Sequence, residues 1–127
     1  MSKYEKGEHD VEGYIKHAQF TLNGQVFACM DSSGPHPFVF SEAVSLFVDC
    51  NTQQEIDHLW DKLTANGGSE SMCGWLKDPF GVSWQIIPRV LGEGLGSEDK
   101  AKAGRVMQAM MQMKKIVIAD LEKAAKG

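Results

Sequence analysis

The first residues that could do chemistry are a histidine and a glutamine near the N-terminus. His17 and Gln19 stand two positions apart in a segment of moderately alternating polarity, so both side chains would lie on the same face of a strand. Imidazole exchanges protons near neutral pH, which makes His17 the best candidate for a catalytic group. The alternative is a sheet histidine that only forms a hydrogen bond.

Ser83 and Gln85 form a second polar pair with strand spacing. A hydroxyl and an amide can orient a carbonyl or phosphonate oxygen of a ligand, and they can equally be polar residues that line a wet cavity. Trp75 and Phe47 would stack on an apolar ligand, although aromatic residues with strand spacing also fill cores. Cys73 would need a neighbouring imidazole to act as a nucleophile, and nothing in the sequence places one there, so we interpret it as a buried structural thiol.

An early turn would position the first polar pair. Asn23-Gly24 predicts a two-residue hairpin turn, because both residues tolerate positive φ. The turn would join strands over residues 14–22 and 25–30 and pair positions whose numbers sum to 47. One face of this hairpin then carries the apolar pair Phe20 with Phe27, and the other face carries the more polar pair His17 with Met30. We expect the apolar face to meet a core and the polar face to meet a cleft or solvent.

The middle of the chain predicts a strand followed by a helix. Residues 43–49 alternate so that Ser45 and Phe47 share one face. Thr52 and Glu55 have the spacing of a capping box, and apolar residues recur at helical spacing up to residue 64. An Asn-Gly-Gly sequence then stops the helix.

A second hairpin and a helical tail follow. Asp78-Pro79-Phe80-Gly81 has the residues of a type I turn, and it would join strands over residues 71–77 and 82–87. Glycines at positions 92, 94 and 96 predict a flexible linker, since a dinucleotide or methyl-donor site would need a parallel strand after them. Helices are expected over residues 99–114 and from about residue 119.

The composition limits the fold class and the partners that this chain can have. The 127 residues suffice for one α+β domain, with helices on one sheet face and an exposed concave face on the other. A net charge of −4 argues against nucleic-acid binding, and no apolar run is long enough to span a membrane or resembles a signal peptide. Three cysteines without CxxC spacing fit reduced thiols, so we expect a cytoplasmic protein without nucleic-acid or membrane partners. The methionine-rich tail is apolar around more than one stripe, which favours a homodimer.

Five motifs spread over nearly the whole chain are specific enough to indicate a family. They are Phe20-x-Leu22-Asn23-Gly24-Gln25, Gly34-Pro35-His36, Cys73-Gly74-Trp75-Leu76-Lys77-Asp78, Phe80-Gly81-Val82-Ser83-Trp84-Gln85-Ile86-x-Pro88 and Val106-Met107-x-Ala109-Met110-x-x-Met113-Lys114-Lys115-Ile116. In these motifs the chain resembles the PhnB-like (demethylubiquinone methyltransferase-like) proteins of the glyoxalase, or vicinal oxygen chelate, superfamily. One departure is Val117, where family members often carry an Asp that would cap the last helix.

The resemblance implies a glyoxalase/bleomycin-resistance-like fold. Its curved mixed β-sheets come from two βαβββ modules and enclose a small-molecule cavity, commonly in a homodimer. We expect residues 1–127 to form one such domain, with residues 1–40 as the remainder of an incomplete first module, 41–91 as the second module and 92–127 as the helical tail. The first module would lack its usual opening strand and helix. A truncated product, a shortened natural variant and a chain that borrows the missing wall from a partner subunit all fit.

The resemblance also implies a divalent metal, which superfamily enzymes usually hold with His, Gln and Glu side chains from both modules. The matching positions here are Gln85 with Ala43 or Ser45 in the second module, and Met30 or Asp31 in the first. These residues offer at most one anionic oxygen, so we expect no metal and no other cofactor.

These considerations give a set of candidate cavity residues and three hypotheses. The candidates are His17, Gln19, Met30, Asp31, Ser45, Phe47, Trp75, Ser83 and Gln85. The first hypothesis is a dimeric protein that binds a small molecule without strong metal dependence. The second is a metal-dependent isomerase, lyase or thiol transferase whose site a partner subunit completes. The third is a noncatalytic dimer that sequesters a hydrophobic compound.

Overall fold

The computed structural model describes residues 1–127. The chain divides into two units, Met1–Phe38 and Val39–Gly127. Each unit has its own sheet, and each is described by itself below.

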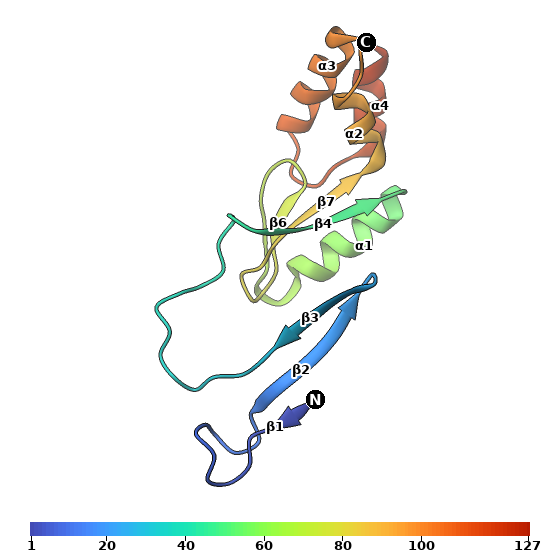
Figure 1. Cartoon of the computed structure of the whole chain (residues 1–127). Helices are drawn as coiled ribbons and strands as arrows, with labels where there is room; N and C mark the ends of the chain where they lie inside the picture. Colours follow the sequence, from blue (N-terminus) through green and yellow to red (C-terminus); the bar gives the residue numbers. More distant parts are fainter. The chain divides into compact units, whose positions relative to one another are not determined.

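The first unit is a three-stranded antiparallel sheet in the order β1-β2-β3 (Figure 1). Its strands are β1 (Ser2–Lys3), β2 (Ile15–Leu22) and β3 (Gln25–Cys29). Asn23 and Gly24 both have positive φ, of 45° and 83°, as a two-residue hairpin turn requires. Leu22 pairs with Gln25 and Phe20 with Phe27, so the predicted hairpin and its register are confirmed.

One expectation for this unit is wrong, and the core contact expected for the apolar hairpin face stays a prediction. β3 ends at Cys29, so Met30 does not pair with His17, which instead faces Ser2 of the short strand β1. The Phe20 and Phe27 rings stack at 5.4 Å between centroids, but Phe20 remains 46% exposed. Tyr4 is the only hydrophobic residue of the unit that is buried, so the apolar face of the hairpin meets no core within its own unit.

The second unit contains a four-stranded mixed sheet in the order β4-β7-β6-β5. Its strands are β4 (Ser45–Cys50), β5 (Ser69–Glu70), β6 (Trp75–Lys77) and β7 (Ser83–Pro88). β4 runs parallel to β7, and the other neighbours are antiparallel. Together with the helix that follows β4, this is one complete βαβββ succession.

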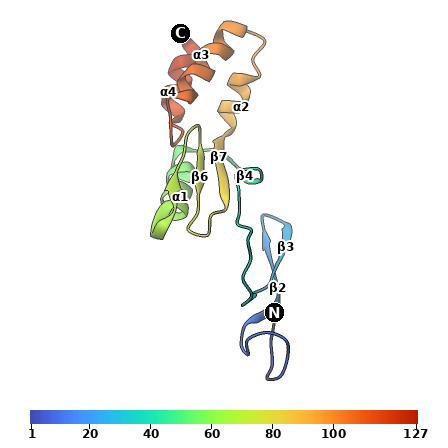
Figure 2. The same ribbon diagram turned by 90° about the vertical axis from the view of Figure 1, so that its left-hand side faces the viewer.

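Helix α1 (Gln53–Thr64) lies on one side of this sheet (Figure 2). Thr52 and Glu55 form the predicted capping box, because each side chain bonds the backbone N–H of the other. A single 3₁₀ turn ends the helix, with Asn66 at a φ of 55°. The core between helix and sheet consists of Cys50, Ile56, Trp60, Leu76 and Ile86.

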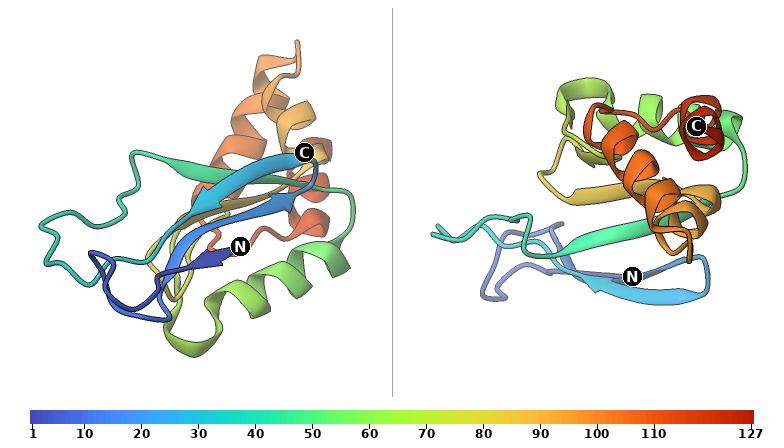
Figure 3. Two further views of the ribbon diagram at one scale, coloured as in Figure 1. Left: turned by 60° about the horizontal axis from the view of Figure 1, so that its bottom comes forward. Right: turned by 90° about the horizontal axis from the view of Figure 1, so that it is seen from above.

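Three helices form the tail: α2 (Arg89–Leu95), α3 (Lys100–Met111) and α4 (Ile118–Lys126). They gather beyond the end of β7 in Figure 1 and stay together in both views of Figure 3. The predicted flexible linker is wrong, because Gly92 and Gly94 lie inside α2. A Cβ atom on Gly94 would come within 3.0 Å of Val106, so this glycine allows α2 to approach α3 closely.

The last helix begins one residue earlier than expected and has no side-chain cap of its own at Val117. Gln53 of α1 supplies a replacement. Its Oε1 accepts from the Ile118 N–H at 2.8 Å, and its Nε2 donates to the Ile116 carbonyl and to Asp57, each at 3.0 Å. The side chain thereby satisfies a helix-end donor and fastens the tail to α1.

The α+β class and the helical C-terminal tail are confirmed. None of the four helices combines the length and the apolar character needed to cross a bilayer.

Candidate functional site

The candidate site lies on the sheet face of the second unit that is turned away from α1, called the opposite face below. Strand alternation places Leu76 and Ile86 against α1, so their neighbours Trp75 and Gln85 point the other way. Five of the predicted cavity residues share the opposite face. They are Ser45, Phe47, Trp75, Ser83 and Gln85.

The register arranges this face in two rows that run across the strands. The polar row consists of Ser69, Lys77, Ser83 and Ser45, which are consecutive cross-strand partners from β5 to β4. The aromatic row consists of Trp75, Gln85 and Phe47. Hydroxyl groups and an ammonium therefore lie next to two aromatic rings, which suits a ligand with a polar head and an apolar body.

Ser83 is the most unusual member of the polar row. Its side chain is only 1% exposed, yet its Oγ has no hydrogen-bond partner. A buried hydroxyl without a partner costs about 1–3 kcal/mol, so native structures rarely contain one without a reason. Ser83 lines a pocket of about 190 Å³ together with Trp75, Lys77 and Ser69. A ligand group in this pocket would satisfy the hydroxyl.

Other polar groups around the pocket already have partners. Gln85 donates through Nε2 to Ser45 Oγ at 2.9 Å, which fixes the amide in the middle of the face. Lys77 Nζ lies 2.6 Å from Glu42 Oε1. The hydrogen bond from Lys77 holds the pKa of Glu42 below its ordinary value.

The candidates from the first unit are placed differently. His17 and Gln19 are exposed on one face of β2, and Met30 is 67% exposed beyond the end of β3. Asp31 is occupied, because its Oδ2 accepts from the Ile15 N–H at 2.8 Å and closes the open end of the hairpin.

Sequence reasoning missed Lys77, Glu42 and Ser69. A signal for Lys77 existed, because it stands two positions from Trp75 in a predicted strand and must share its face. Glu42 precedes β4 in a turn, and Ser69 lies in a two-residue strand, so no periodicity marks either of them.

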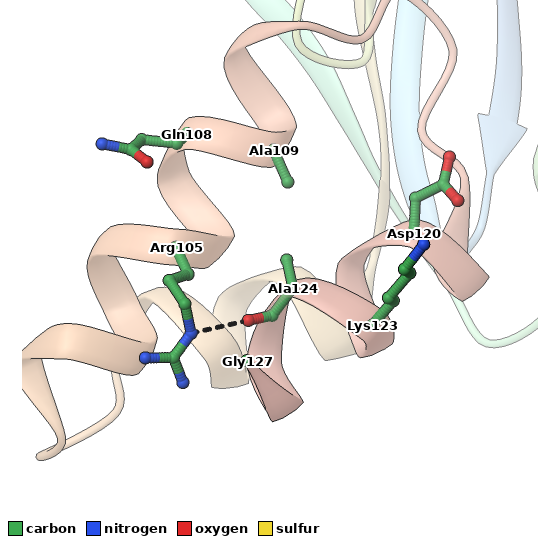
Figure 4. Close-up of a pocket in the computed structure, with 7 residues that line it drawn as sticks. All are labelled: Arg105, Gln108, Ala109, Asp120, Lys123, Ala124 and Gly127. Atoms are coloured by element: carbon green, nitrogen blue, oxygen red, sulfur yellow. Dashed lines mark hydrogen bonds between the residues drawn. The ribbon is translucent and has the colours of Figure 1, made fainter.

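A larger hollow of about 560 Å³ lies between α3 and α4 (Figure 4). Its main polar group, Arg105, is occupied: Nε donates to the Ala124 carbonyl at 2.9 Å and Nη2 to the Ala125 carbonyl at 3.1 Å. Figure 4 shows Gln108 pointing away from α4. We interpret this hollow as the surroundings of a helix C-terminal cap rather than as a binding site.

Comparison with protein families decides the chain's relationship. The model of the 3-demethylubiquinone-9 3-methyltransferase family matches residues 1–87. The chain belongs to this PhnB-like family. The match includes both rows of the opposite face and ends just before α2.

Solved structures agree with this placement of the PhnB-like chain. A PhnB protein from Bacillus cereus is 42% identical, with a TM-score of 0.63, over 68% of this chain and 74% of that one. A Pseudomonas aeruginosa protein is 22% identical, with a TM-score of 0.50, over 61% of this chain and 65% of that one, and it shows the fold alone. A search of curated proteins gave no match.

The opposite face of this PhnB-like chain offers few ligands to a divalent metal, although Glu42 and Glu70 line the pocket beside its rows. Its two rows carry hydroxyls, an amide, an ammonium and aromatic rings, but no carboxylate or imidazole. No three His, Cys, Asp or Glu side chains of the chain come together as metal ligands would.

Proposed function

We propose that the chain is a small-molecule-binding protein of the vicinal oxygen chelate superfamily, and that the opposite face is its ligand site. The observation that carries the proposal is Ser83 Oγ, a buried and unpartnered hydroxyl in a pocket beside Trp75. Clefts that combine a few placed polar groups with aromatic walls are the usual form of small-molecule sites. The βαβββ succession of the second unit supports the superfamily assignment.

We further propose that the protein is a cytoplasmic homodimer. Exposed apolar surface on the hairpin supports the dimer, since Phe20 and Leu22 share one face of β2 and are 46% and 42% exposed, and such surfaces favour association. Met107 and Met111 add exposed apolar surface on α3. Three free cysteines are in keeping with a reducing compartment.

Native mass spectrometry of protein purified without chelator tests this function. We expect two chains, each with one bound organic molecule and no metal. The variant Phe47→Ala should lose the bound molecule, because Phe47 is 60% exposed in the aromatic row. The matched control is Phe80→Ala, which removes an 82% exposed ring from the turn before β7 and should retain the molecule.

Three results would count against the proposal. A chain without any bound molecule, or a bound molecule that Phe47→Ala retains, would argue that the opposite face is not the site. One divalent metal per chain would favour the competing enzyme, a metal-dependent isomerase, lyase or thiol transferase with ligands from the partner subunit.

A further inference from the structure

The polar row of the opposite face contains one cation flanked by hydroxyl groups. Lys77 on β6 lies between Ser69 on β5 and Ser83 on β7, each its direct cross-strand partner. Neighbouring strands are about 4.8 Å apart, so these side chains can reach one small group above the sheet. An ammonium and hydroxyl donors in this arrangement favour an anionic oxygen acceptor.

The ammonium of Lys77 already holds a carboxylate of the chain itself. Glu42 Oε1 lies 2.6 Å from Lys77 Nζ, and both residues line the pocket that contains Ser83. Glu42 is part of the exposed turn before β4, and its side chain is 63% exposed. Ion pairs between exposed side chains contribute little stability, so a competing anion can displace this one.

The Ser83 hydroxyl is the unused hydrogen-bond donor in the pocket. Ser45 already accepts from Gln85, and Lys77 already bonds Glu42, but Ser83 Oγ has no partner at all. Glu42 therefore bonds the ammonium of the polar row but leaves the Ser83 hydroxyl of the same row without a partner. A ligand oxygen that reaches both Lys77 and Ser83 would use that hydroxyl.

We propose that the opposite face binds a small ligand through an anionic oxygen group, a carboxylate or a phosphate, in the position that Glu42 occupies in the free chain. The anionic group would bond Lys77 and Ser83, and an apolar body would lie against Trp75 and Phe47. A volume of about 190 Å³ is below the usual range for drug-sized ligands, so the bound group is small. This inference rests on the proposed ligand-binding function and names the class of ligand.

Isothermal titration calorimetry with four probes tests the ligand class. All four probes contain a benzene ring. Benzoate and phenyl phosphate carry an anionic group on it, whereas benzyl alcohol carries a neutral group and benzylamine a cationic one. We expect benzoate or phenyl phosphate to bind, and the one that binds more tightly identifies the anionic group as a carboxylate or a phosphate. Benzyl alcohol and benzylamine should bind at least about 10-fold more weakly.

Three variants test the residues. Glu42→Gln should tighten binding of the anionic probe by about 2–5-fold, since it removes the internal competitor. Lys77→Gln should weaken it by about 10-fold or more. Ser83→Ala should weaken binding without loss of folding stability, because its hydroxyl has no partner to lose. The matched controls are the exposed helix residues Glu122→Gln and Lys62→Gln, which should leave the affinity unchanged.

Failure of this inference is distinguishable from failure of the proposed function. If benzyl alcohol or benzylamine binds as tightly as benzoate, and Phe47→Ala abolishes that binding, the ligand class is wrong and the site stands. If Glu42→Gln leaves the affinity for the anion unchanged, Glu42 does not occupy the anion position. If no probe binds, both the inference and the proposed site are contradicted.

Discussion

Single side chains decide what the opposite face can do. Ser83 gives the pocket a buried donor, and Lys77 gives it a charge that Glu42 balances. His17, the residue with the most attractive chemistry in the sequence, is exposed on a strand of the first unit and faces Ser2. The ligand site that we propose therefore relies on hydroxyls and one lysine rather than on an acid–base catalyst.

Gln53 allows a prediction at the same scale. Its amide bonds Ile118 N–H, the Ile116 carbonyl and Asp57, so Gln53→Ala should lower the free energy of unfolding by about 1–3 kcal/mol, because these part-buried hydrogen bonds are lost. Urea denaturation measures the change. The control Gln54→Ala changes the exposed neighbouring residue, and its free energy of unfolding should stay within about 0.5 kcal/mol of that of the unchanged protein. Equal effects of the two variants would show that Gln53 does not fasten the tail.

Sequence reasoning reached some of these residues and not others. Ser83, Gln85, Trp75, Phe47 and Ser45 were predictable as neighbours, because strand alternation and two turns determine which side chains share a face. The capping role of Gln53 was not, because its partners Ile116 and Ile118 are more than 60 positions away in the sequence. Local patterns carry no information about such contacts.

At the scale of elements, turns with special backbone requirements were the most predictable features. Asn23-Gly24 determined the register of the first hairpin, and Asp78 holds the second by accepting from the N–H groups of Phe80 and Val82. The glycines of α2 were not predictable as helical, because a glycine in a helix and a glycine in a linker look alike in sequence. Only the close packing of Gly94 on Val106 explains its presence there.

The two glycines of α2 give a matched pair of variants. Nothing lies within 4 Å of a Cβ atom on Gly92, so Gly92→Ala should raise the free energy of unfolding by about 0.5–1 kcal/mol, as alanine does inside a helix. In Gly94→Ala the new methyl group would meet Val106 at 3.0 Å, so the free energy of unfolding of this variant should be about 1–3 kcal/mol lower than that of Gly92→Ala. Thermal denaturation compares them. The same small effect for both variants would contradict a packed helix in this segment.

At the scale of the whole molecule, the two units differ in how they are stabilised. The second unit has two apolar cores, one under α1 and one among the tail helices. The first unit buries only Tyr4 among its hydrophobic residues, which is little for a piece of 38 residues. Composition and motifs predicted the α+β class and the family, but they could not reveal which surfaces the hairpin needs as partners.

The most direct test of the ligand site uses the three tryptophan indoles in a ¹⁵N NMR titration with benzoate. Trp75 lies on the opposite face, whereas Trp60 and Trp84 pack on the α1 side, with their Nε1 groups bonded to Glu70 and Asp78. We predict a saturable shift of the Trp75 indole signal that is larger than the shift of Trp60, whose partner Glu70 lines the pocket, with the Trp84 signal nearly unmoved. An unchanged Trp75 signal, or equal shifts of all three, would contradict a ligand site on this face.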